Sequence, residues 1–357
     1  MKKTSNKESS NMLIKILKSR IFLTIITIII VLAILEIILT IRENPSYKSD
    51  RFEILDNPIL GYRGTETVEE IITNPNGSKE VLGRNSLGFR DKERSFENKN
   101  NQSRIVVLGD SVMLGEKVRA NESIPSLLNK KTQQTNEQYE FINLAQNGYT
   151  AVQELEILKM YGIKYDPELV IIGYVINDAG TPDNGPIALM QGHREAINWK
   201  NRILKQAGMP RSCEVKNFFN KFMIVKEFQT KINNLKPNNN KSSVYNLWSP
   251  YYKDQCEWGT VEYAFLEIAK ISKEKEFEVL LVIMPFMWMG EDISDLQEIY
   301  DLVRAEGEKN GFHILSLVEP IEEQGFSNMK FDSYHFSIEG NKFSSDIIFE
   351  EVQKILK

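Results

Sequence analysis

Serine, histidine and aspartate occur in this sequence at positions where they could form a nucleophilic catalytic triad. The stretch RIVVLGDS, residues 104–111, runs a short apolar segment into Gly-Asp-Ser and places Ser111 at its end. FDSYHFSIEG, much later in the chain, contains Asp332 and His335, three residues apart. A serine hydroxyl becomes a nucleophile when a histidine takes its proton and a carboxylate orients that histidine. We therefore expect Ser111 to be the nucleophile, His335 the base and Asp332 the group that fixes the imidazole tautomer.

Donors for a developing oxyanion are expected beside this serine. Gly148, in NLAQNGYTA, presents a free backbone N–H at the start of a helix-like segment, and Asn177, in GYVINDAG, could aim its side-chain amide at the same point. With the Ser111 N–H, they would supply three donors. Taken singly, each signal has a structural alternative, because Asp-Ser is an ordinary helix N-cap and Gly and Asn are typical turn residues. Their common placement at the ends of expected strands favours the catalytic interpretation.

These residues resemble a known set of family markers. Ser111, Gly148, Asn177 and His335 are similar, in type and order, to the four marker residues of the SGNH hydrolases, also called GDSL-type esterases and lipases. The resemblance implies a flavodoxin-like three-layer α/β/α sandwich with a parallel sheet of about five strands. It further implies a Ser-His-Asp triad and an oxyanion hole formed by Ser111, Gly148 and Asn177. It covers residues 104–357 apart from one insertion.

The resemblance is accompanied by two departures from the usual family pattern. Val112 stands where Leu often follows the Gly-Asp-Ser motif, and the third block has Val175 where a glycine is usual, with Gly173 further back. In this family the acid is the least indispensable member of the triad, which makes Asp332 the weakest assignment. NSLGFRD, residues 85–91, looks like a segment found upstream of the nucleophile in membrane-anchored members.

Short apolar runs bounded by Gly, Asn, Asp or Pro alternate with helix-like segments through most of the chain. Such alternation predicts a parallel α/β sheet covered on both faces, with ligands bound at the carboxyl ends of its strands. Residues 180–259 break this alternation and are interpreted as an insertion lying over the strand ends. The expected strands are Ile105–Leu108, Phe141–Leu144, Leu169–Ile176, Val279–Met284 and Ile314–Val318.

The N-terminal region contains one long apolar segment. Residues 21–41, IFLTIITIIIVLAILEIILTI, are enough to cross a hydrocarbon core of about 30 Å as a helix. Residues 1–20 are basic, so the positive-inside rule predicts a cytoplasmic tail and an extracytoplasmic remainder. A cleaved signal peptide is the alternative, but the apolar run is long for one and no small-x-small cleavage site follows it. We expect a single-pass cell-membrane protein anchored by this helix.

The remainder of the chain divides into two regions. Residues 42–103 are expected to form a polar stalk, up to about residue 60, and a β-rich segment, and residues 104–357 the hydrolase domain. The cysteines are Cys213 and Cys256. Outside the cytoplasm they could form a disulfide, and two buried thiols are the alternative.

Several aromatic residues and one arginine are candidates for substrate contact. Trp199, Trp248 and Trp288 could stack on sugar rings, and core packing is the alternative for each. Arg90 could contact an anionic substrate, with a surface or sheet-edge role as its alternative.

The expected function is a serine esterase that removes acyl groups, such as acetyl, from envelope or extracellular glycans. One alternative is an O-acyltransferase with the same triad, which would need a multi-pass membrane partner because one span cannot move an acyl donor across a bilayer. A second alternative is a non-catalytic anchored binding module. A net charge of −5 gives no basic surface for nucleic acid. No metal or organic cofactor is expected.

Overall fold

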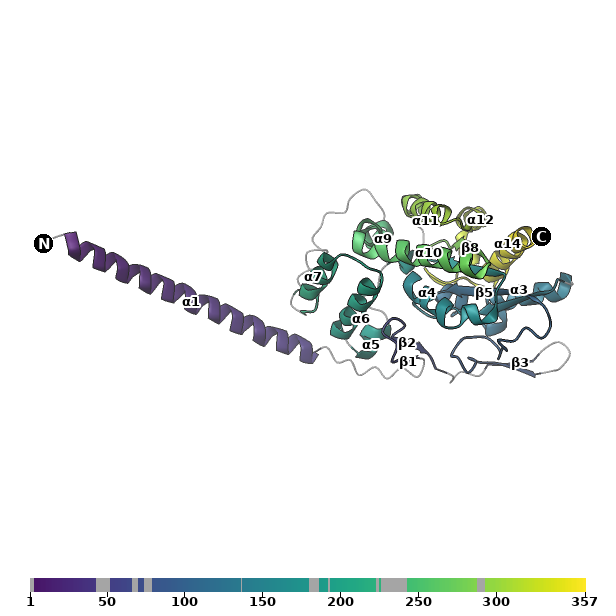
Figure 1. Ribbon diagram of the computed structural model, residues 1–357, viewed down its shortest axis with the longest axis horizontal. Coiled ribbons are helices and arrows are strands. Elements are labelled where there is room, and N and C mark those ends of the chain that lie inside the picture. The colour runs from purple at the N-terminus through teal and green to yellow at the C-terminus, as the bar shows by residue number, and fades with distance from the viewer. Residues whose placement is uncertain are drawn as a thin grey trace.

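In the computed structural model, a long N-terminal helix leads into a domain built around a parallel sheet (Figure 1). Trp288 lies outside the described residues, as does part of the 180–259 region. The structure describes residues 3–42, 52–65, 70–73, 79–135, 137–179, 186–191, 193–222, 225, 243–287 and 293–357.

The central sheet has five strands in the order β6-β5-β7-β8-β9, and every neighbouring pair is parallel. Each apolar run expected to form a strand overlaps one of these strands, so the expected parallel sheet is confirmed. Because the strands are parallel, their carboxyl ends meet at one edge. The strands are β5 (Ser103–Gly109), β6 (Tyr139–Asn143), β7 (Leu169–Tyr174), β8 (Glu278–Ile283) and β9 (His313–Ser316).

Helices cover both faces of this sheet, which gives the expected three layers. The strand register places Phe141 of β6 and Tyr174 of β7 on opposite faces. Phe141 contacts Phe349 of α14, whereas Tyr174 contacts Phe265 of α10. Helix α3 packs with α14, and α4 packs with α10. The covering helices are α3 (Ile124–Thr135), α4 (Ala151–Met160), α10 (Gln255–Lys275), α11 (Gln297–Lys309), α12 (Val318–Gln324) and α14 (Ile338–Ile355).

The described part of the expected insertion is helical. Helix α10, which covers the sheet, begins at Gln255, inside the range assigned to the insertion. Cys213 of α7 and Cys256 of α10 form a disulfide with a Cα–Cα distance of 5.7 Å, so the insertion is fastened covalently to the covering layer. Its helices are α5 (Pro186–Gln191), α6 (His193–Gln206), α7 (Arg211–Asn220) and α9 (Ser243–Lys253).

The segment between the long helix and the sheet forms two antiparallel pairs of short strands. β1 (Phe52–Ile54) pairs with β2 (Tyr62–Gly64), and β3 (Glu70–Thr73) pairs with β4 (Lys79–Leu82). The expectation of a polar stalk up to about residue 60 is wrong for its last residues. Ile59 and Leu60 are buried, and the backbone carbonyl of Leu60 accepts a hydrogen bond from the Gln153 side chain at 2.8 Å. Apolar burial therefore holds this segment against the sheet domain.

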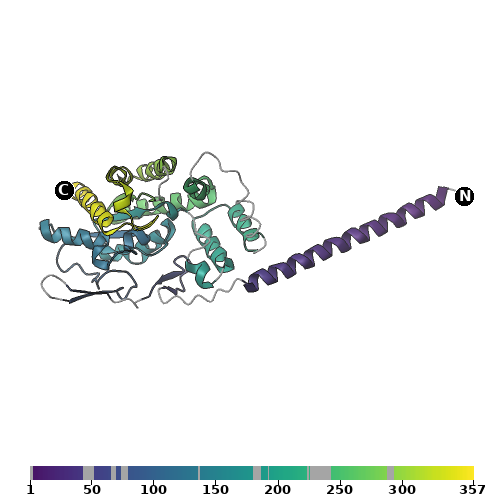
Figure 2. The ribbon, with the colours of Figure 1, turned by 180° about the vertical axis from the view of Figure 1, so that it is seen from behind.

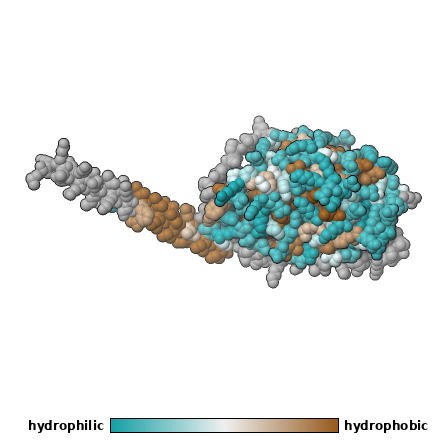
Figure 3. Space-filling view, viewed as in Figure 1, coloured by the Kyte–Doolittle hydropathy of each residue, from teal (hydrophilic) through white to brown (hydrophobic). Residues whose placement is uncertain are grey.

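Helix α1 (Lys3–Arg42) extends away from the domain (Figure 2). Its part Arg20–Arg42, 23 residues, is long and apolar enough to cross a bilayer. Apolar side chains cover this part, whereas most of the visible face of the domain is hydrophilic (Figure 3). Glu36 is buried and forms an ion pair with Arg194 of α6, Oε1 to Nη2, at 2.9 Å. The domain therefore touches the apolar helix near its C-terminal end.

Candidate active site

Ser111, His335 and Asp332 lie in series at the carboxyl edge of the sheet. The chain leaves β5 at Gly109 and turns into the short helix α2 (Ser111–Leu114), so Ser111 is its first residue. His335 precedes α14, and its Nε2 lies 2.9 Å from Ser111 Oγ. Its Nδ1 lies 2.9 and 3.0 Å from the two carboxylate oxygens of Asp332. In this arrangement Asp332 can hold the proton on Nδ1, which leaves Nε2 to accept the serine proton.

The Asp332 carboxylate is itself held by the backbone. The N–H groups of Tyr334 and His335 each donate to Asp332 Oδ1 at 2.9 Å. Burial raises the pKa of Asp332, but hydrogen bonds from the Tyr334 N–H and from His335 outweigh it, so the pKa lies below its ordinary value. The carboxylate is therefore ionised and fixed in the orientation that the imidazole needs.

A second carboxylate, Glu116, contacts the same imidazole. Glu116 Oε2 lies 3.5 Å from His335 Nε2 and accepts a hydrogen bond from the Asn147 side chain at 2.7 Å. The hydrogen bond with His335 is the main cause that lowers the pKa of Glu116 to about 2. Burial lowers the pKa of His335, but Glu116 and Asp332 more than compensate and raise it. Sequence reasoning missed Glu116, whose one signal is its position five residues after Ser111.

Two of the expected oxyanion donors lie at the Ser111 turn, and Gly148 follows a loop whose Gln146 N–H donates to the Gly109 carbonyl at 3.0 Å. Because Ser111 opens α2, its N–H has no partner within the helix, and the Asp110 carboxylate caps the Val112 N–H at 2.8 Å. Gly148 has φ +66°, a conformation that favours glycine. Its N–H takes part in no backbone hydrogen bond within the described ranges. Asn177 Nδ2 donates to Asp110 Oδ2 at 3.0 Å, which places this amide beside the turn and leaves its second N–H for another acceptor.

The turn between β5 and α2 depends on two glycines and one methionine. Gly109 and Gly173 are register partners on β5 and β7. A Cβ at Gly109 would lie 2.6 Å from Met113 Cγ, and one at Gly173 would overlap the same side chain. Met113 is fully buried. The absence of a side chain at Gly173 therefore leaves space for Met113 beneath the Ser111 turn. Val175, two residues later, donates its N–H to Asp178 Oδ2 at 2.7 Å.

Residues from the N-terminal segment hold the loop that carries Gly148. The Tyr62 hydroxyl donates to the Asn147 carbonyl at 2.7 Å, and the Tyr149 hydroxyl donates to the Tyr62 carbonyl at 2.6 Å. Arg84 donates to the side chains of Gln146 at 2.8 Å and Asn147 at 3.2 Å. Sequence reasoning missed these contacts, and only the proximity of Arg84 to the NSLGFRD segment hinted at them.

Arg90 forms hydrogen bonds to the loop that carries Glu116. One guanidinium nitrogen donates to the Gly115 carbonyl, and the other donates to the Val118 carbonyl at 2.8 Å. These carbonyls flank Glu116. Arg90 therefore holds the loop that presents Glu116 to His335, and its contact with a substrate stays a prediction.

Two of the tryptophans proposed for sugar stacking, Trp199 and Trp248, are packed into the protein. Trp199 is 4% exposed, and its indole N–H donates to the Ile59 carbonyl at 2.8 Å. Trp248 is 9% exposed and packs against Phe286, whose ring contacts Tyr334 with a centroid distance of 4.8 Å. Stacking on a sugar needs an exposed ring face, so neither indole can make the sugar contact that was expected from the sequence. Trp288 lies outside the described residues.

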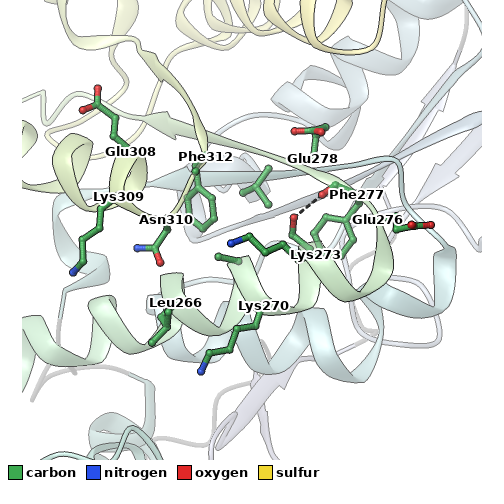
Figure 4. Close-up of a pocket in the computed structure, with 14 residues that line it drawn as sticks. Leu266, Lys270, Lys273, Glu276, Phe277, Glu278, Glu308, Lys309, Asn310 and Phe312 are labelled. Atoms are coloured by element: carbon green, nitrogen blue, oxygen red, sulfur yellow. Dashed lines mark hydrogen bonds between the residues drawn. The ribbon is translucent and has the colours of Figure 1, made fainter.

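A separate hollow of about 630 Å³ lies at the opposite edge of the sheet, near the beginnings of β8 and β9 (Figure 4). Lys270, Lys273 and Lys309 line it together with Phe277 and Phe312. It is remote from the triad, because the triad occupies the carboxyl ends of the strands. Within the described ranges, no group of three or more His, Cys, Asp or Glu residues could hold a metal ion.

Comparison with known proteins gives structural likeness only. No protein-family model and no curated protein matches the sequence. A psychrotrophic esterase from Pseudoalteromonas sp. is 15% identical with a TM-score of 0.42 and covers 71% of this chain and 99% of its own. A lipase/acylhydrolase from Enterococcus faecalis is 16% identical with a TM-score of 0.42, covering 71% and 96%. An acetyl xylan esterase is 12% identical with a TM-score of 0.41, covering 70% and 99%.

Proposed function

We propose that this chain is a membrane-anchored, extracytoplasmic serine esterase of the SGNH type. The observation that supports the proposal is the continuous series from Asp332 through His335 to Ser111, with 2.9 Å at each junction. A helix N-cap alone needs no histidine on its serine. An oriented imidazole on a serine at the carboxyl edge of a parallel sheet is the arrangement that acyl transfer requires.

The proposed reaction has two halves. Ser111 Oγ attacks the ester carbonyl while His335 Nε2 takes the hydroxyl proton, and the carbonyl electron pair moves onto oxygen. The Ser111 N–H, the Gly148 N–H and the Asn177 amide stabilise this oxyanion. The intermediate then expels the alcohol, which takes the proton from His335. Water repeats the sequence on the acyl-enzyme and releases the acid.

Glu116 would act on the charged form of the base in both halves. While the imidazole is neutral, Nε2 presents a lone pair to the serine and gains nothing from a nearby carboxylate. Once His335 holds two protons, Glu116 and Asp332 face a positive charge from both nitrogens. An interaction that strengthens only when the imidazolium forms lowers the barrier.

The proposed substrates are acyl esters, acetyl esters among them, of envelope or extracellular glycans. The apolar helix Arg20–Arg42 supports a position at the membrane, and the basic residues before it support a cytoplasmic N-terminus. A domain held there meets the glycans of the cell envelope. No cofactor takes part in the proposed steps.

The test uses the full chain in detergent micelles with p-nitrophenyl acetate. We expect a burst of nitrophenol followed by slower turnover, and Ser111→Ala should lower the turnover rate about 10⁶-fold. Ser327→Ala, at an exposed serine of the short helix α13 (Phe326–Met329), is the matched control and should behave as wild type. Equal rates for Ser111→Ala and wild type would refute the proposal. Acylation of an added oligosaccharide instead of acetate release would assign the chain as an acyltransferase.

A further inference from the structure

Helix α7 exposes an apolar face on the insertion. Val215 and Phe218 are 53% and 54% exposed, and Phe222, just after the helix, is 39% exposed. Their spacing of three and four residues places them on one side of a helix. The opposite side is used for packing, because Cys213 forms the disulfide and Asn217 donates to the Asn201 side chain at 3.0 Å. We call Val215, Phe218 and Phe222 the α7 face.

The insertion lies against the C-terminal part of the apolar helix α1. Helix α7 packs with α6, and Arg194 of α6 pairs with Glu36 of α1 at 2.9 Å. Glu36 lies six residues before the end of α1 at Arg42, or about 9 Å along the helix axis. Helix α7 occupies the edge of the domain from which α1 extends (Figures 1 and 2). The contact therefore places α6 and α7 at the level where α1 would leave a bilayer.

The length of the connection keeps the domain close to that level. Ten residue steps separate Arg42, the end of α1, from Phe52, the start of β1. Even fully extended, they span at most about 35 Å. The Glu36–Arg194 ion pair restricts the domain further, because it links the apolar helix directly to the insertion.

We infer that the α7 face inserts into the headgroup–acyl boundary of the bilayer that α1 spans. Aromatic and aliphatic side chains on one side of a surface helix are the groups that enter this boundary. The exposed side chain of Arg211, one turn before Val215, would then bind the lipid phosphates that lie above the acyl chains. This second contact would fix the tilt of the domain and hence the height of Ser111 above the membrane. The inference rests on the membrane span of the proposed function.

The test measures lipid exposure at single sites of the full chain in lipid nanodiscs. The native cysteines form a disulfide, so an introduced cysteine can be spin-labelled alone. Phe218→Cys is the test site, Ile29→Cys reports on the span, and Leu302→Cys, an exposed leucine of α11, is the aqueous control. We expect the ratio of oxygen to nickel-chelate accessibility at Phe218→Cys to exceed that at Leu302→Cys several-fold and to approach that at Ile29→Cys. Val215→Cys should give the same result.

The labelled sites separate the three ways in which the inference could fail. An aqueous signal at Phe218→Cys and Val215→Cys with a lipid signal at Ile29→Cys would overturn the docking surface and leave the span intact. An aqueous signal at Ile29→Cys would overturn the span and the docking surface together. Dipolar coupling between Phe218→Cys labels of two chains in one nanodisc would assign the α7 face to a second copy and overturn the inference. Esterase activity enters none of these readouts, so loss of the catalytic proposal would not be confused with any of them.

Discussion

Replacing Glu116 by glutamine should change the pH dependence of catalysis in two ways. The carboxylate lies 3.5 Å from His335 Nε2 and raises the pKa of this imidazole together with Asp332, against the effect of burial. In Glu116→Gln the pKa of His335 falls, so the base stays neutral to lower pH. The acidic limb of kcat/KM should therefore move to lower pH. At higher pH, where the base is already neutral, the variant should be slower because the imidazolium loses a partner.

The size of the loss follows from the separation of the charges. At 3.5 Å, two unit charges interact by about 1.2 kcal/mol in a water-like medium and about 4.7 kcal/mol at an effective dielectric constant of about 20. The side chains are only 24% and 13% exposed, so solvent screens the pair incompletely, while Lys117, 3.6 Å from the other Glu116 oxygen, offsets part of the attraction. The loss therefore lies between the two values, which corresponds to an acylation slower by about 10-fold to 10³-fold on the plateau.

The assay is kcat/KM for p-nitrophenyl acetate across the pH range in which histidine titrates. The wild-type and Glu116→Gln curves should meet on the acidic side, because there His335 is protonated in the free enzyme as in the transition state and loses the same partner in both. On the plateau the variant should be slower, with its acidic limb ending at lower pH. Glu323→Gln makes the same chemical change at an exposed position on α12 and should leave the curve unmoved. Superimposable curves for Glu116→Gln and wild type would show that Glu116 does not act on the imidazole. A uniform loss without displacement of the acidic limb would assign Glu116 to holding Asn147 instead.

Three further variants test the Asn177 donor, the hydrogen bond of Tyr62 to the loop that carries Gly148, and the disulfide. Asn177→Ala should lower the burst rate by about 10²–10³-fold through loss of an oxyanion donor, and an unchanged rate would exclude its amide from the hole. Tyr62→Phe removes the hydroxyl that donates to the Asn147 carbonyl and should lower the free energy of unfolding by about 1 kcal/mol. The burst should also become slower with KM unchanged, and an unchanged burst rate would contradict the role of this hydrogen bond in holding the Gly148 loop. The double variant Cys213→Ser, Cys256→Ser removes a cross-link between residues 43 positions apart and should lower the free energy of unfolding, measured with denaturant, by about 4 kcal/mol. An unchanged unfolding midpoint would contradict this expectation.

The sheet and the proximity of Asp332, His335 and Ser111 could be predicted because their signals are local. The apolar runs that form β5 and β7 are short and bounded by turn residues, and Asp332 and His335 lie three residues apart. Their approach to Ser111 across 224 residues follows from a general property of parallel sheets, whose carboxyl ends converge. Such arguments need no knowledge of individual tertiary contacts.

The supporting contacts could not be predicted because they join distant segments. Tyr62 meets Asn147 over 85 residues, and Arg84 meets the same loop over 62. Nothing in a tyrosine or arginine near the start of the domain indicates which carbonyl it will meet. Trp199 shows the same limit. Its residue type suggested a ring that stacks on sugars, and only its burial beside Ile59 in the structure identifies it as a core residue.

The link between Cys213 and Cys256 has a consequence for the timing of maturation. A chain still facing a reducing compartment would hold two thiols, and α7 would lack its covalent fastening to α10. Oxidation after export would then tighten a region that includes both the α7 face and the helix packed on α4. In the proposed extracytoplasmic placement, the domain would thus reach its full rigidity only after it has left the compartment of its synthesis.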